Sequence, residues 1–264
     1  MKEEILRQLQ TTWAGRNLYY FSEIDSTNTY AKQLGKQSEP HGTIVVAQSQ
    51  SAGRGRLGRK WNSPNDGNIY MTILLRPKFS PQKASMLTLV MAYSVAMSIR
   101  EFVDTSVYIK WPNDIVMNGK KICGILTEMS AEVDDINYVV IGIGVNVMSH
   151  EFPDALQDIA SSILIESGQN ISETALISSI MRNFEQAYQR FCETEDMSNI
   201  YQEYNQMLIN RNRQVRILDG ENGYEAYAMG IDKMGQLLIR KQDGSVEAVF
   251  AGEVSVRGLY GYVE

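Results

Sequence analysis

Residues 53–61 read Gly53-Arg-Gly-Arg-Leu-Gly-Arg-Lys-Trp61 and carry the strongest functional signal in the chain. Their first eight positions hold four cationic side chains and three glycines. A loop of this kind can direct backbone N–H groups and guanidinium groups onto one anion. The whole chain of 264 residues is acidic, with 31 Asp and Glu against 25 Lys and Arg and a net charge of −6. The positive charge of this loop therefore predicts a site for a polyanionic ligand such as a nucleotide.

The same residues exclude two common nucleotide-binding folds. The spacing G-x-G-x-x-G matches the dinucleotide fingerprint, but that motif opens a helix, and here Pro64 and Gly67 soon follow as helix breakers. A P-loop needs Lys and then Ser or Thr after its last glycine, whereas Arg59 and Lys60 follow Gly58. Neither a Rossmann fold nor a P-loop fold is predicted. A solvated basic turn is the alternative that the loop alone leaves open.

Composition narrows the class of protein further. The chain is 44% hydrophobic and 21% charged, which is typical of a globular protein with its own core. Residues 1–7 alternate charged and apolar side chains and lack the apolar segment of a signal peptide. No stretch approaches the ~20 apolar residues that a membrane helix needs. We therefore expect a cytoplasmic protein that does not enter a membrane.

Metal and nucleophile motifs are not found. The chain has two cysteines and two histidines, Cys123, Cys192, His41 and His150. Their spacing matches neither a zinc site nor a catalytic triad. We expect no metal site built from protein side chains, and both histidines are interpreted as surface loop residues.

Periodicity predicts strands and helices up to about residue 210. Strands are expected over residues 17–24, 43–47, 68–75, 107–111, 115–117, 121–129 and 137–147. Asn118-Gly119, between two of these segments, is a strong hairpin-turn signal. Helices are expected over residues 1–13, 26–35, 81–103 and 199–210 and in a stretch that begins near 172, where apolar residues recur every three or four positions.

The pattern changes near residue 211. Five short alternating segments are separated by turn residues, at 213–218, 223–232, 236–240, 246–251 and 254–257. Such a run of short strands favours a small β-barrel. We therefore predict a first domain over residues 1–211 and a second over residues 212–264.

A second motif, Lys110-Trp-Pro-Asn-Asp114, follows the strand expected at 107–111. Lys110 closes an apolar run, so its ammonium is expected to point toward the end of the sheet or into a pocket. Taken alone, this motif is more typical of a surface lysine followed by ordinary turn residues. Its occurrence together with the Gly/Arg loop favours a shared site.

In these residues the chain resembles the biotin protein ligases. Matching segments occur in the same order as in that family, and together they span roughly residues 17–260. They are Ser26-Thr27-Asn28, Gln50-Ser-Ala-Gly-Arg-Gly-Arg-Leu-Gly-Arg-Lys-Trp61, Lys110-Trp-Pro-Asn-Asp114, Gly119-Lys-Lys-Ile-Cys-Gly124-Ile-Leu-Thr-Glu128, Gly142-Ile-Gly-Val-Asn146 and Gly252-Glu-Val-Ser-Val-Arg257. The Gly/Arg segment and Lys110–Asp114 are specific in combination.

The resemblance implies an α+β fold and a two-step reaction. The implied fold is a mixed β-sheet with packed helices, like the catalytic core of class II aminoacyl-tRNA synthetases, followed by an SH3-like barrel. Biotin and MgATP would give biotinoyl-5′-AMP and pyrophosphate. A lysine of a biotin carboxyl carrier protein would then attack this mixed anhydride.

The resemblance also implies roles for individual residues. Lys110, Arg54 and Arg56 would be catalytic, because cations offset the repulsion between two reacting anions. Trp61 would stack on adenine, and Asn113 and Asp114 would serve ATP and Mg²⁺. The remaining implied ligand contacts come from small or neutral polar residues: Ser26, Thr27, Asn28, Gln50, Gly53, Gly55 and Gly124. The segment Ser26–Asn28 is also typical of a plain helix cap.

Two alternatives compete with this interpretation: a related ligase and a protein of a different class. A lipoate-type ligase shares a similar core, but it would lack the Gly/Arg loop and Lys110–Asp114. A DNA-binding regulator is disfavoured by the net charge of −6. Only some 20 residues precede the first catalytic strand, too few for the helix-turn-helix domain of some relatives. We therefore expect a form that acts only as a ligase and does not bind DNA. The resemblance also allows a homodimer, and Leu57 stands where some relatives have another Arg.

Overall fold

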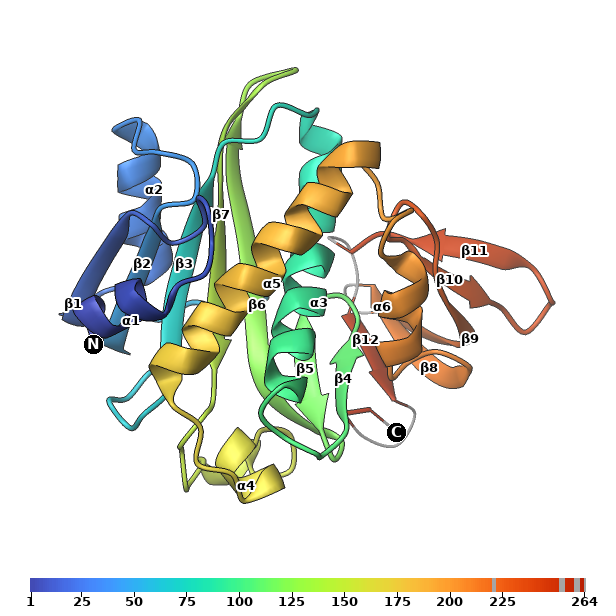
Figure 1. The fold of residues 1–264 in the computed structure, drawn as a ribbon. Helices are drawn as coiled ribbons and strands as arrows, with labels where there is room; N and C mark the ends of the chain where they lie inside the picture. The colour runs from blue at the N-terminus through green and yellow to red at the C-terminus, as the bar shows by residue number, and fades with distance from the viewer. Residues whose placement is uncertain (220–221, 252–254, 259–261, 264) are drawn as a thin grey trace.

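The structure is a computed structural model that describes residues 1–219, 222–251, 255–258 and 262–263. The larger sheet has seven strands in the order β1-β2-β3-β7-β6-β5-β4 (Figure 1). Its strands are β1 Leu18–Ile24, β2 Ile44–Gln50, β3 Ile69–Leu75, β4 Val107–Lys110, β5 Asp114–Met117, β6 Lys120–Ala131 and β7 Ile136–Val145. Only the pair β1–β2 is parallel, and the other five pairs are antiparallel. The predicted mixed sheet is confirmed.

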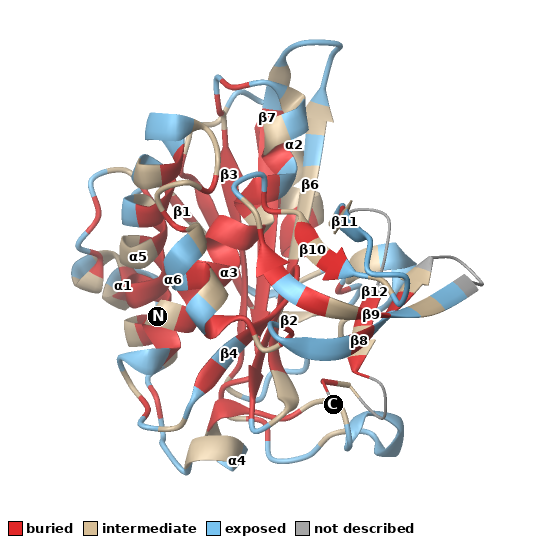
Figure 2. Cartoon of the chain, turned by 90° about the vertical axis from the view of Figure 1, so that its right-hand side faces the viewer, coloured by how far each residue is buried: buried red, intermediate tan, exposed pale blue. Residues whose placement is uncertain are grey.

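Helices cover both faces of this sheet. They are α1 Lys2–Gln8, α2 Thr27–Lys36, α3 Leu87–Arg100, α4 Ile163–Ser167, α5 Glu173–Thr194 and α6 Tyr201–Met207, with 3₁₀ turns at Arg56–Gly58, Pro81–Met86 and Asp154–Leu156. Helices α3 and α5 pack against each other over one face, and α2 covers part of the other (Figure 1). Figure 2 shows the buried strands enclosed between these helices.

Strict alternation along the central strands sorts their side chains onto the two faces. On β7, Ile141 and Ile143 belong to the large core beneath α3 and α5. Val140 belongs to the smaller core beneath α2. Gly142 and Gly144 fall on the same face as Val140, because side chains two residues apart share a face. Near the N-terminal end of α2, this face of the sheet therefore has two positions of β7, Gly142 and Gly144, that carry no side chain.

The C-terminal strands form a separate antiparallel sheet in the order β11-β10-β9-β8-β12. They are β8 Arg213–Asp219, β9 Asn222–Ile231, β10 Leu237–Arg240, β11 Val246–Val249 and β12 Ser255–Gly258. These strands agree with the expected segments and confirm a small C-terminal β domain. Residues 252–254 of the Gly252–Arg257 segment lie outside the described residues.

The expected helices were only partly correct. The helix expected over residues 1–13 ends at Gln8, because Leu9 is extended. The helix expected over residues 81–103 divides into a 3₁₀ turn and α3, whose residues are buried on nearly every side. Helix α4 was not expected, although Ser162 caps it and Gly168 ends it in the left-handed conformation. None of the described helices is long and apolar enough to cross a membrane.

His41 is not the surface loop residue that was expected. His41 is half-buried, and the centroid of its ring lies 4.4 Å from the centroid of the Trp13 ring. Its Nδ1 accepts a hydrogen bond from the Arg76 amide at 3.0 Å. Burial, followed by the charge of Arg76, lowers the pKa of His41. The residue is therefore part of the packing around an aromatic cluster, whereas His150 is exposed.

Candidate active site

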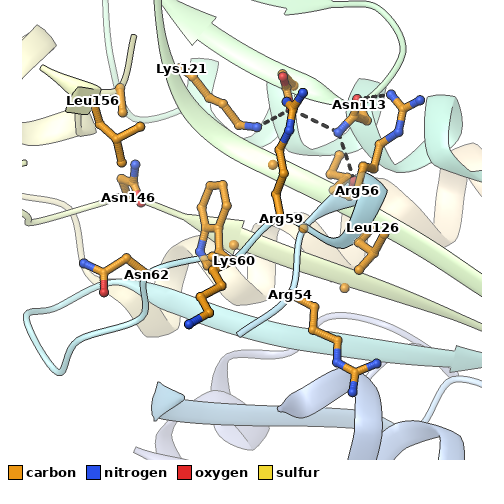
Figure 3. Close-up of a pocket in the computed structure, with 18 of the residues that line it drawn as sticks. Arg54, Arg56, Arg59, Lys60, Asn62, Asn113, Lys121, Leu126, Asn146 and Leu156 are labelled. Atoms are coloured by element: carbon orange, nitrogen blue, oxygen red, sulfur yellow. Dashed lines mark hydrogen bonds and ion pairs between the residues drawn. The ribbon is translucent and has the colours of Figure 1, made fainter. Parts of the chain in front are cut away.

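A cavity of about 410 Å³ opens on the face of the sheet where β7 has its glycines. Twelve of the thirteen residues predicted to serve the site line it: Ser26, Thr27, Asn28, Gln50, Arg54, Gly55, Arg56, Trp61, Lys110, Asn113, Asp114 and Gly124. Figure 3 shows how the Gly/Arg loop, the sheet and the Asn113 turn converge there. The exception is Gly53. A Cβ at that position would lie 2.4 Å from the Trp61 carbonyl oxygen, so Gly53 allows the two ends of the loop to approach closely.

The cavity floor is made of paired glycines. Gly144 of β7 lies opposite Gly124 of β6 in the sheet register. The indole of Trp61 packs on this floor, because Cβ atoms on Gly144 and Gly124 would lie 2.5 and 2.8 Å from its ring atoms. The Trp61 Nε1–H is buried and has no hydrogen-bond partner in the described structure. A buried donor of this kind needs an acceptor, and it faces the cavity side of the sheet.

Neutral polar groups form one end of the cavity at the start of α2. Gln50 Oε1 accepts hydrogen bonds from the backbone N–H of Thr27 at 2.9 Å and from its hydroxyl at 3.1 Å. Gln50 Nε2 donates to the Ser63 hydroxyl at 2.9 Å. Ser26 is the N-cap of α2 and accepts from the Thr29 amide at 3.5 Å. Ser26 therefore both caps α2 and lines the cavity.

Asn28 is buried at the same end, and its amide is held from both sides. Its Oδ1 accepts a hydrogen bond from Thr72 Oγ1 at 2.6 Å, and its Nδ2 donates to Glu128 Oε2 at 2.9 Å. A Cβ on Gly142 would lie 2.1 Å from Asn28 Oδ1. Glycine is therefore required at position 142 for Asn28 to occupy this place.

The Gly/Arg loop folds back on itself as a short hairpin. Gly55 N–H donates to the Arg59 carbonyl at 2.7 Å, and Trp61 N–H donates to the Gly53 carbonyl at 3.0 Å. At its tip Leu57 has a φ of 56° and is 72% exposed. An exposed leucine in the left-handed region costs conformational energy without burying apolar surface. The loop is therefore a hairpin with a short 3₁₀ turn at Arg56–Gly58, and it does not form the helix of a Rossmann motif.

Arg56 joins three parts of the chain. Its Nη1 donates to Asn113 Oδ1 at 2.7 Å, and its Nη2 donates to the Ala251 carbonyl in the C-terminal domain at 2.7 Å. Burial lowers the pKa of Arg56, and Asp114 opposes this shift. Arg54 lines the same cavity but points in another direction (Figure 3). The two arginines of the motif therefore occupy different positions around the cavity.

Positive charge exceeds negative charge in the cavity wall. Seven cationic side chains face three carboxylates: Arg54, Arg56, Arg59, Lys60, Lys110, Lys121 and Arg257, against Asp66, Asp114 and Glu151. Lys110 is only 5% exposed. Burial lowers its pKa to about 8 from 10.5; the Asp114 carboxylate opposes this shift, and three neighbouring cations add to it. An anionic ligand would relieve this unfavourable concentration of charge.

Asp114 is the carboxylate nearest to these cations. Its Oδ1 lies 2.6 Å from Lys121 Nζ and accepts from Asn113 Nδ2 at 3.0 Å. Its Oδ2 accepts a hydrogen bond from the Tyr262 hydroxyl, and the Tyr262 ring centroid lies 4.1 Å from Lys110 Nζ. Burial acts to raise the pKa of Asp114, but Lys121 and Lys110 outweigh it and the pKa is lowered. The carboxylate is therefore ionised.

Sequence reasoning missed several contributors to this site. Thr72 is fully buried beneath it, and its place as the one polar residue in an apolar strand was a usable signal. Lys121 lay inside a quoted motif without an assigned role. Tyr262 and the cavity-lining residues between 151 and 160 carried no recognisable pattern. Among the described residues, no group of three or more His, Cys, Asp or Glu could hold a metal ion.

Comparison with known proteins assigns the mixed sheet and its cationic cavity to the biotin/lipoate ligases. Residues 20–146 match the model of the Biotin/lipoate A/B protein ligase family, and residues 212–257 match the Biotin protein ligase C terminal domain. The bifunctional ligase/repressor BirA of Bacillus spizizenii is 38% identical over 259 residues, which cover 97% of this chain and 78% of BirA. The chain therefore belongs to the biotin protein ligase family.

Other relatives agree with this assignment. The biotin–[acetyl-CoA-carboxylase] ligase of Mycobacterium tuberculosis is 26% identical over 245 residues, with 90% of this chain and 88% of that protein covered. The solved structure of biotin protein ligase from Aquifex aeolicus in complex with biotin and ATP superposes with a TM-score of 0.80. Its sequence is 28% identical, and the match covers 92% of this chain and 99% of that one.

Proposed function

We propose that this protein uses ATP to attach biotin to a lysine of a biotin carboxyl carrier domain. A biotin carboxylate oxygen bonds to the α-phosphorus, the bond from that phosphorus to the bridging oxygen breaks, and pyrophosphate leaves. The acceptor amine then attacks the carbonyl carbon of biotinoyl-5′-AMP and AMP leaves. The observation that carries the proposal is the buried Lys110 in a cavity where cations outnumber carboxylates.

The residue roles follow from the chemistry of the cavity wall. We propose that Lys110 neutralises the biotin carboxylate and the α-phosphate as they approach, because a fixed cation stabilises such charge without reorganisation. The uncharged groups of Ser26, Thr27, Asn28 and Gln50 suit the ureido ring of biotin, which is polar and neutral.

The loop is proposed to retain the reactive anhydride. The Arg56 contacts with Asn113 and Ala251 support a role in closing the Gly/Arg loop over the intermediate. Exclusion of water matters here, because the anhydride would otherwise hydrolyse. Arg54 and Gly55 belong to the same loop and are proposed to contact the ligand.

Asn113 is proposed to act differently from the role first expected of it, and Trp61 to have a second role. One face of the Trp61 indole rests on the glycine floor, so adenine stacking stays a proposal for its other face, and its unpartnered Nε1–H is a further candidate for ligand binding. The Asn113 amide donates to Asp114 and Ile125 and accepts from Arg56. It is therefore proposed to position other groups. Gly124 would provide floor space, and Gly53 would close the loop.

Mg²⁺ is proposed to arrive as MgATP. Such ions are bound through one or two carboxylates together with substrate phosphates and water, so a cage of several acidic side chains is not required. Asp114 is the ionised carboxylate nearest to Lys110, and it would need to release one of its present partners to contact the ion.

Four broader predictions accompany the activity. Residues 1–211 are proposed as the catalytic domain and residues 212–264 as the C-terminal domain, supported by the change from α6 to β8. A cytoplasmic location and a homodimer are also predicted. Analytical ultracentrifugation tests whether the protein is a dimer. We infer that residues 1–264 act as a ligase and do not bind operator DNA, although several relatives are named ligase/repressor. Salt-sensitive retention of DNA in filter binding would contradict this inference.

Transfer of biotin tests the proposed activity. The protein is incubated with biotin, MgATP and a purified carboxyl carrier domain, and the acceptor is analysed by intact mass. One biotin per carrier is expected, and none on a carrier whose target lysine is replaced by arginine. An unlabelled carrier, or labelling by lipoate in place of biotin, would overturn the proposal.

A further inference from the structure

Lys121 is a cation of the cavity that the proposed mechanism has not used. It lies on β6 and lines the cavity, with its side chain 21% exposed. Its Nζ lies 2.6 Å from Asp114 Oδ1 and 5.2 Å from the centroid of the Trp61 ring. A lysine with these neighbours has far less freedom than one on an open surface, because salt bridge and ring contact both restrict its ammonium.

The surrounding backbone holds Lys121 in place. Its N–H donates to the Ile159 carbonyl at 2.7 Å, and its carbonyl accepts from the Ser161 N–H at 2.9 Å. A Cβ on Gly124 would lie 3.1 Å from both Cε and Nζ of Lys121. The glycine therefore leaves the space in which this ammonium sits. Lys121 is therefore held at both its backbone and its terminal group.

The charge around Asp114 is not balanced. This one ionised carboxylate lies beside two ammonium groups, Lys110 and Lys121, and the Arg56 guanidinium also acts on it. Among the groups that most shift the pKa of Lys110, Asp114 is the only acidic residue. The cluster therefore has an excess of positive charge that an incoming anion would neutralise.

We propose that Lys121 binds a phosphate group of ATP during adenylation, a role that rests on the proposed function. Lys110 and Lys121 then act from either side of Asp114 on the two reacting anions. The Lys121 ammonium stabilises negative charge on non-bridging phosphate oxygens while the oxygen–phosphorus bond to biotin forms and pyrophosphate leaves. No proton needs to be transferred from it. Asp114 orients Lys121 until the nucleotide arrives.

The variant Lys121→Met tests this role. Its kinetics of biotin-dependent ATP–pyrophosphate exchange are compared with those of the wild type. The matched control is Lys120→Met on the same strand, because Lys120 does not line the cavity and its Nζ donates to the Gln157 carbonyl at 3.0 Å. In Lys121→Met, kcat/KM for ATP is expected to fall roughly 10- to 100-fold, as for loss of a hydrogen bond to a charged group. Biotin affinity by calorimetry should change less than about twofold, and Lys121→Arg should restore part of the activity.

A second pair of variants separates phosphate binding from mere support of Asp114. Lys121→Met is introduced into an Asp114→Asn background, and the cost to kcat/KM for ATP is compared with its cost in the wild type. A phosphate-binding lysine costs activity in both backgrounds. If the effect vanishes in Asp114→Asn, or if biotin affinity falls as much as that for ATP, the inference is wrong. Absence of exchange in the wild type would instead reject the proposed function.

Discussion

Replacement of Lys110 by methionine should abolish adenylation and also stabilise the protein without ligands. Methionine keeps the length and apolar stem of lysine but removes the ammonium group. Lys110 is 5% exposed, and burial is the main reason that its pKa is lowered to about 8 from 10.5. The folded protein therefore holds a charge that the unfolded chain would carry at lower cost.

The size of this effect follows from linkage. One pKa unit corresponds to about 1.4 kcal/mol, so the shift of Lys110 corresponds to about 3 kcal/mol of destabilisation at neutral pH. The penalty is complete below pH 8, where lysine is protonated in both states. It declines as the pH rises from 8 to 10.5, because only the unfolded chain then stays protonated. The variant should gain about 2–3 kcal/mol at pH 7 and much less at pH 10.

Urea unfolding at pH 7 and pH 10 measures the gain, and pyrophosphate exchange measures activity. Exchange is expected to fall at least about 100-fold, as for loss of a group that stabilises developing charge. Lys120→Met serves as the control and should leave both quantities close to wild type. A Lys110→Met protein that is no more stable than wild type at pH 7 would refute the argument from buried charge, and unchanged exchange would remove Lys110 from catalysis.

Three further predictions address the loop, the floor and the fold. Arg56→Gly loses its bonds to Asn113 and Ala251, so biotinoyl-5′-AMP should escape and label serum albumin; wild-type retention would contradict this. Gly142→Ala places a Cβ 2.1 Å from Asn28 Oδ1 and should weaken biotin binding at least about tenfold by calorimetry, whereas unchanged affinity would reject the Asn28 role. Glu185 accepts hydrogen bonds from the backbone of residues 12–14, and Glu185→Ala should cost about 1 kcal/mol in urea unfolding at pH 7. Burial acts to raise the pKa of Glu185, but the backbone N–H groups outweigh it and lower the pKa below 4.5. The cost of Glu185→Ala should therefore disappear as the pH falls through that pKa. A cost that does not change with pH would argue against these hydrogen bonds as its source.

Local sequence signals predicted most of the fold. The Asn118-Gly119 turn has φ values of 46° and 80° and joins β5 to β6, as the hairpin signal indicated. Ser172 caps α5 at the predicted start. The continuous helix expected over 81–103 was wrong over Pro81–Met86 and ended early at Arg100. Apolar periodicity does not distinguish a 3₁₀ turn from an α-helix.

The site was predictable where a motif carried it and not where long-range contacts did. Lys110 and the Gly/Arg loop could be found because their residue types are unusual at those positions. Lys121 could not be told apart from Lys120, since a register shift between Ile115 and Val116 helps to determine which lysine faces the cavity. Tyr262 reaches Asp114 across 148 positions of sequence, a contact that only tertiary folding creates.

This cavity is proposed to join biotin to AMP, and ATP–pyrophosphate exchange measures that reaction step. Purified protein is mixed with MgATP and labelled pyrophosphate, with biotin, with lipoate or with neither. We predict exchange with biotin alone, and its loss in Lys110→Met. Equal exchange with lipoate, or no exchange with biotin in a correctly folded protein, would contradict the account.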